Sequence, residues 1–410
     1  MDYRIVKPDR DLFGEIQLPP SKSISNRLLI MQALSGHSFQ IKNLSESDDT
    51  ISLKNALIGY RERIDAGHAG TTMRFLTAYL SQCPGKYFLT GSDRMKKRPI
   101  GELVDALRQI GAEIEYPEKK GFPPLVIHGK SLPGGQVSID SSISSQFISA
   151  LLMIAPCLRK GLDLNLEGKI MSSSYIRLTL NLMNELGIEY DWIGNRIVIK
   201  PQVFKSEQME VEADWSAASY WYEMATLAEN VDLLIKGLSS KSYQGDAILS
   251  RLFNDFGIVT EYFTDGIRIK KGDIYIKEFN YDFTDHPDLV QTLSVVCTLK
   301  NIPFRFTGTE TLRIKETDRI YALKNELGKL KLKINTKEDG SQIYYDGRSK
   351  FKPGQEVRIR TYQDHRMAMA FAPVALVGKS VVIEDSQVVS KSYPGFWDDL
   401  KKTGFQVQPI

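Results

Sequence analysis

One short pattern recurs six times along this chain: a predicted helix carries an apolar residue shortly before a glycine, and a predicted strand often follows. Successive glycines are 52, 76, 70, 71 and 76 residues apart, and they are Gly59, Gly111, Gly187, Gly257, Gly328 and Gly404. Glycine readily takes the left-handed conformation that ends a helix, so we expect all six to end helices. Apolar and polar residues alternate over residues 111–115 and 187–190, which predicts strands there.

This repeat restricts the possible folds. A unit of roughly 70 residues is too long for a solenoid repeat and fits an α/β module of two helices and about four strands. Six modules predict two lobes of three. The alternative is that each glycine marks an ordinary helix end in any α/β protein, but near-equal spacing over four intervals favours a true repeat. We interpret the shorter first interval as a trimmed loop.

Length and composition indicate a globular enzyme. A chain of 410 residues is too long for one ordinary core and predicts two or three domains. Its net charge of +3 provides no global field that would attract nucleic acid or an anionic membrane. Cys83, Cys157 and Cys297 are scattered, which argues against a disulfide framework or a zinc site and predicts a reducing cytoplasm. We find neither a signal peptide pattern nor a run of about 18 apolar residues, so a secreted or membrane-spanning protein is not expected.

Residues 19–27 combine two prolines, several hydroxyl groups and two cations, Lys22 and Arg27, at the start of an apolar helix. We expect Ser25 or Asn26 to cap this helix. The N-terminus of a helix favours an anion even without added cations, so the stretch predicts a phosphate or carboxylate site. The alternative is that these are ordinary solvated capping residues. A nucleotide P-loop is excluded because the glycines that would precede the lysine are missing.

Four further predicted helices begin with small or polar residues and continue apolar on all sides, and they start near Gly70, Ser144, Asp214 and Asp364. Helices of this kind are buried, so we expect the polar residues at their starts to face a binding site. The simplest target is one anion site shared between the lobes. Gly70 is informative because a small residue lets a ligand approach the backbone. His68, just before it, is more often a capped or solvated histidine than a catalyst.

Charged residues also gather near predicted helix starts. Four cations lie within residues 94–98, and arginine suits forked recognition of carboxylates and phosphates. Asp288 opens one apolar run. Lys315 and Glu316 open another together with Arg319, and on a helix the two cations, four residues apart, would share a face. Each group taken alone is also compatible with an exposed, charge-rich helix start.

Taken together, these stretches resemble the 5-enolpyruvylshikimate-3-phosphate synthase family, whose order they follow from Pro19 to Pro394. The matching segments are residues 21–27, 47–50, 69–74, 94–101, 144–147, 315–319, 364–369 and 391–394. The resemblance implies a two-lobed inverse α/β barrel, the enolpyruvyl transferase fold, with six βαβαββ repeats, three in each lobe. It implies one lobe of residues 1–20 and 215–410, a second lobe of residues 21–214, and an active site in the cleft between them.

The resemblance also implies a reaction. The family transfers the enolpyruvyl group of phosphoenolpyruvate to the 5-hydroxyl of shikimate 3-phosphate and releases phosphate, a step of the shikimate pathway to aromatic amino acids. No metal and no cofactor are implied. The expected partners are these two small substrates, without nucleic acid or membrane, and we expect a cytoplasmic monomer. Glyphosate is the family's inhibitor at the phosphoenolpyruvate subsite.

The family's site residues carry over to positions of this sequence. Those implied to bind shikimate 3-phosphate are Lys22, Ser23, Arg27, Ser144, Ser145, Gln146, Ser172, Tyr175, Asp288, Thr311 and Lys315. Those implied to bind phosphoenolpyruvate are Lys22, Gly70, Arg94, Gln146, Arg319, Arg366 and Lys391. By the same resemblance, Asp288 is the base at the 5-hydroxyl and Glu316 the proton shuttle at the enol methylene. Lys22 is a further proton donor.

Several positions depart from the family pattern, among them Phe75 and Ser173-Ser174, and two of the departures leave their own roles open. Thr311 stands where the family often has asparagine against the shikimate phosphate, and His68 replaces a usual asparagine.

Three alternative functions remain to be weighed. UDP-N-acetylglucosamine enolpyruvyl transferase would have a cysteine in the loop of Arg94, which has none here, and asparagine where Ser23 stands. A non-catalytic anion-binding relative would have lost Asp288 or Glu316, and both are present. An enzyme acting on RNA ends would need a nucleic-acid groove, which the small net charge does not support.

Overall fold

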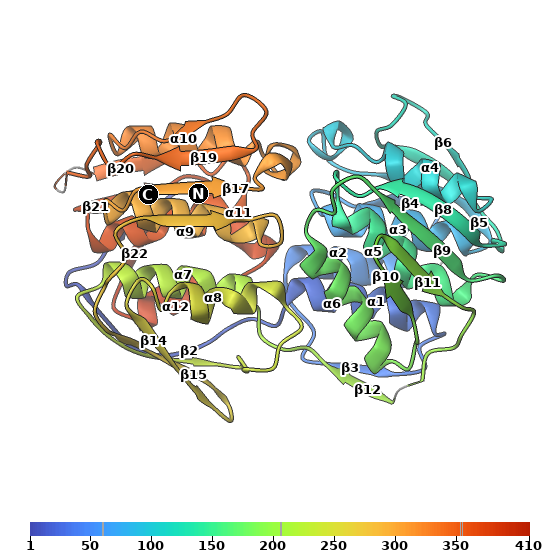
Figure 1. Cartoon of the computed structure of the whole chain (residues 1–410), viewed down its shortest axis with the longest axis horizontal. Helices are drawn as coiled ribbons and strands as arrows, with labels where there is room; N and C mark the ends of the chain where they lie inside the picture. The colour runs from blue at the N-terminus through green and yellow to red at the C-terminus, as the bar shows by residue number, and fades with distance from the viewer. Residues whose placement is uncertain (60, 206, 353, 355) are drawn as a thin grey trace. The chain divides into compact units, whose positions relative to one another are not determined.

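The computed structural model describes residues 1–59, 61–205, 207–352, 354 and 356–410. The chain divides into two compact units (Figure 1). Unit 1 consists of Met1–Pro19 and Glu212–Ile410, and unit 2 of Pro20–Val211. Each unit has its own hydrophobic core. Among the described residues, no helix is both long and apolar enough to cross a membrane.

Three modules make up unit 2. The second consists of β4 (Arg63–Asp65), α3 (Gly70–Gln82), β5 (Gly85–Thr90), α4 (Gly101–Gln109), β6 (Glu113–Glu115) and β7 (Leu125–Gly129). The third repeats this order with β8 (Gly135–Asp140), α5 (Ser145–Ile154), β9 (Leu162–Glu167), α6 (Ser173–Glu185), β10 (Asp191–Ile193) and β11 (Arg196–Ile199). In both, the first two strands are parallel and a hairpin completes a four-stranded sheet, of order β4-β5-β7-β6 and β10-β11-β9-β8.

The first module of unit 2 is reduced. It consists of α1 (Lys22–Leu34), β3 (Gln40–Lys42), α2 (Asp48–Leu57) and β12 (Gln208–Glu210). β12 comes from the end of the unit and pairs parallel with β3. In the described part of the chain this sheet has two strands and no hairpin. The short first interval therefore reflects a missing hairpin, and the predicted trimmed loop is wrong.

Unit 1 has three complete modules. The first contains β2 (Asp11–Gln17), α7 (Trp215–Leu227), β13 (Asn230–Lys236), α8 (Leu249–Leu252), β14 (Ile258–Phe263) and β15 (Gly266–Lys271). The second contains β16 (Phe279–Asp282), α9 (Val290–Leu299), β17 (Phe304–Thr307), α10 (Arg319–Lys329), β18 (Asn335–Thr336) and β19 (Gln342–Tyr345). The third contains β20 (Glu356–Ile359), α11 (His365–Phe371), β21 (Ser380–Ile383), α12 (Phe396–Lys402), β22 (Gln406–Pro409) and, from the N-terminus, β1 (Tyr3–Val6). Six modules, three in each unit, are thus confirmed.

The first helix of every module is buried. α1, α3 and α5 pack on one another in unit 2, and α7, α9 and α11 pack on one another in unit 1. Nearly every residue of α7 and α9 and all of α11 are inaccessible to solvent, as their all-round apolar sequences predict. The polar residues that begin these helices are therefore the ends of rigid, enclosed elements.

Three local predictions need correction. Five of the six repeat glycines have positive φ, but Gly328 lies inside α10, and Lys331 takes the left-handed conformation at φ 61°. The strand predicted over residues 187–190 begins only at Asp191. α1 begins at Lys22, so Ser25 and Asn26 lie within its first turns and do not cap it. A helix can extend beyond a glycine when the next residues still pack, and a local pattern does not show this.

Candidate active site

The starts of α1, α2 and α3 are tied together by buried side chains. The Asn26 amide donates to Thr71 Oγ1 at 2.8 Å, and the Thr50 hydroxyl donates to Asn26 Oδ1 at 2.8 Å. The Thr72 hydroxyl donates to the backbone carbonyl oxygen of Asp49 at 3.1 Å. Because Asn26, Thr50 and Thr72 are fully buried, this network holds the three helix starts together within unit 2.

Lys22 is the first residue of α1, and its ammonium group lies 3.1 Å from Asp49 Oδ2. Both side chains are mostly buried. A cation at a helix N-terminus opposes the helix dipole, so a nearby negative charge stabilises it. Asp49 supplies one negative charge, and an anionic ligand would supply another.

Gly70 is the first residue of α3, and an arginine lies directly over it. A Cβ atom at Gly70 would lie 2.7 Å from Arg98 Nη1 and 3.0 Å from Arg98 Nη2. Arg74, on the next turn of α3, donates to the carbonyl oxygen of Pro99 at 3.0 Å and so fixes the segment that carries Arg98. A buried guanidinium at the start of a helix is well suited to an anion.

The sequence resemblance assigns Arg94 to phosphoenolpyruvate, and the structure brings another arginine of the same stretch, Arg98, to Gly70. Arg98 is 5% exposed, whereas Arg94 is half-buried. Both arginines belong to the same basic stretch, and a run of cations does not reveal which member turns inward. The assignment of Arg94 to phosphoenolpyruvate stays a prediction, and Arg98 is a further cation of the same stretch, next to Gly70.

Arg27 links α1 to α5 and α6. Its guanidinium donates to the Thr179 hydroxyl at 2.7 Å, to the Ser149 hydroxyl at 3.0 Å and to the carbonyl oxygens of Ser23 and Tyr175 at 2.9 and 3.4 Å. Burial lowers the pKa of Arg27 to about 10, so it remains a cation at neutral pH. The hydrogen bonds are all to uncharged groups, which leaves its positive charge for a nearby anion.

The other predicted residues of unit 2 lie at helix starts. Ser144 caps α5, and its hydroxyl oxygen accepts a hydrogen bond from the backbone N–H of Gln146 at 3.3 Å. Ser145 is buried as the first residue of the same helix. Ser172 precedes α6 with φ 57°, an uncommon conformation for a residue with a side chain, and Tyr175 lies in the first turn of that helix. Backbone strain of this kind persists where the surroundings hold it, and it often marks functional sites.

In unit 1, Arg319 joins three carboxylates. Its Nε donates to Asp364 Oδ2 at 2.8 Å, Nη1 to Asp288 Oδ1 at 2.9 Å and Nη2 to Glu316 Oε2 at 2.9 Å. The arginine side chain is 2% exposed. Burial alone lowers the pKa of a guanidinium, but the three carboxylates outweigh it and raise the pKa of Arg319 above its ordinary value.

Arg366 completes the group from α11. Its Nη2 donates to Asp288 Oδ2 at 2.7 Å and its Nη1 to the Tyr220 hydroxyl at 3.3 Å. Each oxygen of Asp288 therefore faces a different arginine. Burial raises the pKa of Tyr220, which remains a neutral phenol. Asp288, Glu316, Arg319 and Arg366, four residues predicted from three separate stretches, are thus brought together in one unit.

Asp246 is a carboxyl group of this region that sequence reasoning missed. It is 4% exposed, it accepts from the Ser216 hydroxyl at 2.5 Å, and His286 Nδ1 lies 3.9 Å from it. Burial, and then the charge of Asp288, raise the pKa of Asp246 to about 7. The segment around Asp246 has no repeat or charge run, so only the fold reveals the proximity.

The remaining predicted residues of unit 1 flank this group. Lys315 precedes α10 in an extended conformation, so the expected helical face shared by Lys315 and Arg319 is wrong. Thr311 is 5% exposed. The Lys391 ammonium group donates to the carbonyl oxygen of Gln363 at 2.7 Å, and Gln363 has φ 57° directly before α11. Lys391 thereby steadies a strained segment next to Arg366.

These groups have a clear chemical capacity. The two guanidinium groups on Asp288 can bind a phosphate or carboxylate in forked geometry, and the two carboxylates beside them can accept and return protons. Unit 2 adds the cations Lys22 at the start of α1, Arg27 within α1, and Arg98, which lies over the start of α3. The chain therefore has the groups needed to bind polyanionic substrates and transfer protons.

Comparison with known proteins agrees with this interpretation. A family model described as EPSP synthase (3-phosphoshikimate 1-carboxyvinyltransferase) matches residues 6–59 and 53–400. A 3-phosphoshikimate 1-carboxyvinyltransferase of Bacteroides fragilis is 49% identical over 409 residues, which cover 100% of this chain and 99% of that protein. The enzyme of the same name from a Sulfurovum species is 36% identical over 430 residues, covering 98% of this chain and 99% of the relative.

A solved structure resembles the whole chain. The EPSP synthase of Acinetobacter baumannii superposes with a TM-score of 0.78 at 21% identity, and the match covers 100% of both chains. This likeness confirms the predicted fold class, a two-lobed inverse α/β barrel.

Proposed function

The chain belongs to the EPSP synthase family, and from this premise we propose that it transfers the enolpyruvyl group of phosphoenolpyruvate to the 5-hydroxyl of shikimate 3-phosphate. The products are 5-enolpyruvylshikimate 3-phosphate and inorganic phosphate. The observation that supports this most directly is the group of Arg319 and Arg366 around Asp288, with Glu316 beside it. It combines anion binding and proton transfer, which are the two requirements of the reaction.

For shikimate 3-phosphate, we propose that unit 2 supplies most contacts. Ser144 and Ser145 begin α5, where unpaired backbone N–H groups favour a phosphate. The other residues assigned to this substrate in unit 2 are Lys22, Ser23, Arg27, Gln146, Ser172 and Tyr175. Asp288, Thr311 and Lys315 are its proposed contacts in unit 1.

For phosphoenolpyruvate, the proposed contacts are cationic, because this substrate carries both a phosphate and a carboxylate. Gly70 and Arg98 form one proposed contact surface, and the absence of a Cβ atom at Gly70 lets the Arg98 guanidinium lie against the start of α3. The other proposed contacts are Lys22, Arg94, Gln146, Arg319, Arg366 and Lys391.

We assign proton transfer to Asp288, Glu316 and Lys22. Before substrate binds, two arginines hold the carboxylate of Asp288 and so compete with its function as a base. An anionic substrate that recruits Arg319 or Arg366 would weaken that competition. Asp288 would then accept the proton of the 5-hydroxyl only when substrate is present.

The reaction requires two opposite proton transfers at the enolpyruvyl group. Glu316 or Lys22 delivers a proton to the methylene carbon while the 5-hydroxyl oxygen attacks the neighbouring carbon, which gives a tetrahedral intermediate. The methyl group then returns a proton, the carbon–oxygen bond to phosphate breaks, and the double bond forms again. Fixed cations around the departing phosphate stabilise its developing charge.

We also propose that the enzyme works as a cytoplasmic monomer. The three cysteines are present as free thiols, and Cys297 is buried in the core of unit 1, which suits a reducing compartment. Size-exclusion chromatography with light scattering would test the monomer.

Phosphate release by the purified chain tests the reaction itself. We expect release with phosphoenolpyruvate and shikimate 3-phosphate together, and none when UDP-N-acetylglucosamine replaces shikimate 3-phosphate. Release only with the nucleotide sugar would assign the sister reaction. Release with neither acceptor would indicate a non-catalytic relative.

A further inference from the structure

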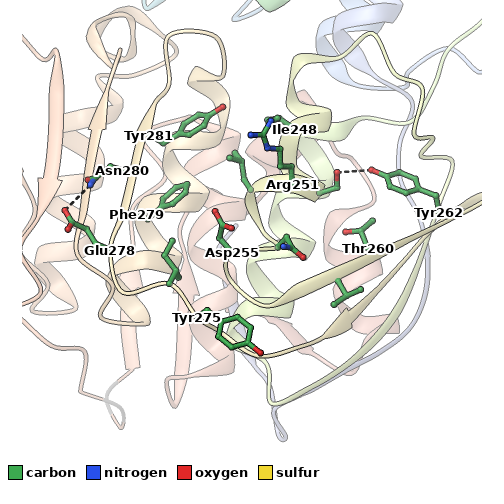
Figure 2. Close-up of a pocket in the computed structure, with 15 residues that line it drawn as sticks. Ile248, Arg251, Asp255, Thr260, Tyr262, Tyr275, Glu278, Phe279, Asn280 and Tyr281 are labelled. Atoms are coloured by element: carbon green, nitrogen blue, oxygen red, sulfur yellow. Dashed lines mark hydrogen bonds between the residues drawn. The ribbon is translucent and has the colours of Figure 1, made fainter.

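A pocket lies within unit 1, in a part of the chain to which the proposed reaction assigns no residue. Its volume is about 1090 Å³. It is lined by the α8 region, by β14, and by β16 with the segment before it (Figure 2). None of the residues assigned to the two substrates is among its lining residues.

The pocket lies beside α8, where two modules of unit 1 meet. In the other two modules of unit 1, the corresponding helices are α10 and α12, and each reaches the first strand of the following module. Glu326 of α10 accepts a hydrogen bond from the backbone N–H of Arg360, just after β20, at 3.0 Å. α12 packs on β2. α8 covers only Leu249–Leu252. The pocket lies at the junction between β14 and β16. β14 and β16 are also edge strands of their sheets.

Aromatic and aliphatic side chains form the base and walls of this pocket. Leu252 and Phe279 are buried at its base. The rings of Phe279 and Tyr281 are parallel within 7°, with centroids 6.0 Å apart. Tyr275 is 79% exposed and Tyr262 is 43% exposed, although both are large apolar side chains. Exposed aromatic residues gathered around a concavity are typical of a binding site.

Two opposite charges lie in the same pocket. Figure 2 shows Arg251 near Tyr281 and Asp255 toward the centre of the view. Within the described residues, neither Arg251 nor Asp255 forms an ion pair or a side-chain hydrogen bond. By contrast, Glu278 accepts from the Asn280 amide at 3.1 Å, and the Tyr262 hydroxyl donates to Ser250 at 2.8 Å. A cation and an anion of this kind are available to a ligand that carries both charges.

We propose that this pocket binds a small aromatic zwitterion, of the class of aromatic α-amino acids. The ring would lie against Phe279 and Tyr281, where aromatic groups prefer offset or edge contacts. The Arg251 guanidinium would bind the carboxylate in forked geometry, and Asp255 would bind the ammonium group. The volume of about 1090 Å³ exceeds the range of about 300–1,000 Å³ that is usual for small-molecule sites, so such a ligand fits without displacing the lining residues.

The same charges argue against the substrates of the reaction. Shikimate 3-phosphate and phosphoenolpyruvate carry only negative charge, and both Asp255 and Glu278 would repel them. The pocket therefore selects for a different chemical class, and the inference does not depend on the proposed function.

Calorimetric titration of the full chain with three related ligands tests the proposal. L-phenylalanine carries both charges, 3-phenylpropionate lacks the ammonium group, and phenethylamine lacks the carboxylate. We expect L-phenylalanine to bind at least ~10-fold more tightly than either analogue. Arg251→Met should weaken L-phenylalanine to the level of phenethylamine, and Asp255→Asn should weaken it to the level of 3-phenylpropionate.

Two control variants show whether L-phenylalanine binds in this pocket. Arg348 is 89% exposed and lies outside the pocket, so Arg348→Met should leave L-phenylalanine binding unchanged. Arg251→Met should retain wild-type phosphate release, which verifies its fold and does not touch the proposed substrate contacts. The proposal is overturned if the wild type binds no L-phenylalanine at about 10 mM, if Arg251→Met binds it equally well, or if saturating shikimate 3-phosphate displaces it.

Discussion

The Asp246→Asn substitution tests the buried carboxyl group beside Asp288. Burial and the Asp288 charge raise the pKa of Asp246 to about 7, from an ordinary value of 3.8. The folded state therefore binds this proton more tightly than the unfolded state does. The stability that the carboxyl group contributes is fully present below about pH 4 and is lost as the pH rises through 7.

The magnitude follows from the two pKa values. A difference of about 3 pKa units corresponds to about 4 kcal/mol in the free energy of unfolding. Asparagine has nearly the same shape, keeps an oxygen that accepts from the Ser216 hydroxyl, and does not ionise. We expect the variant to match the wild type near pH 4 and to be more stable by up to about 4 kcal/mol at pH 8.

Urea unfolding followed by tryptophan fluorescence measures this difference. Three of the four tryptophans, Trp215, Trp221 and Trp397, belong to unit 1, so the signal reports mainly on the unit that contains Asp246. Asp398→Asn is a matched control, because its carboxylate is 73% exposed. A stability difference that is the same at pH 4 and pH 8, or a variant less stable at pH 8, would refute the reasoning.

Three further substitutions have defined outcomes. In Gly70→Ala the new Cβ atom would lie 2.7 Å from Arg98 Nη1, so the guanidinium must move until this distance is an ordinary contact of at least 3.4 Å. The KM for phosphoenolpyruvate should therefore rise at least ~10-fold, and glyphosate inhibition should weaken. Unchanged values of both would place Gly70 away from the ligand. Glu316→Gln should lower turnover at least ~10²-fold while shikimate 3-phosphate binding, measured by calorimetry, stays near normal; near-normal turnover would exclude a proton-transfer role. Glu223 is fully buried, its oxygens have no hydrogen-bond partner among the described residues, and burial raises its pKa well above the usual range. Glu223→Met should therefore stabilise unit 1 by ~1–3 kcal/mol, and a lower melting temperature by calorimetry would contradict this.

The modular fold was largely predictable because each module ends its helices in a similar local way. The glycine spacing predicted six modules and placed most helix ends correctly, including Gly111 and Gly187. It did not predict that β12 pairs with β3, because these strands are separated by residues 43–207. Pairing between distant strands leaves little trace in local periodicity, and neither does the loss of a hairpin.

The candidate site, like the fold, was predictable only in part. The charge pattern pointed to Asp288, Glu316, Arg319 and Arg366, and the fold brings them into contact. The resemblance assigned Arg94 to phosphoenolpyruvate, which stays a prediction, and it did not point to Arg98, whose position over Gly70 is set by tertiary packing. Asp246 was missed because it lies between Gly245 and Ala247 without a repeat or a charge run, and Asp364 was predicted as a helix start but not as a partner of Arg319. The roles assigned to all these residues remain predictions.

The parallel pairing of β2 with β13 has a consequence for the order of synthesis. The two strands belong to one sheet, yet residues 18–229, including all of unit 2, separate them. At ordinary translation rates, β2 waits on the order of 10–40 s for its partner, and during that time unit 2 can fold. An unpaired strand can aggregate by pairing with another chain. β2 has three apolar residues and also the polar or charged residues Asp11, Glu15 and Gln17, a composition that discourages premature pairing. On the ribosome, unit 1 is therefore begun first and completed last.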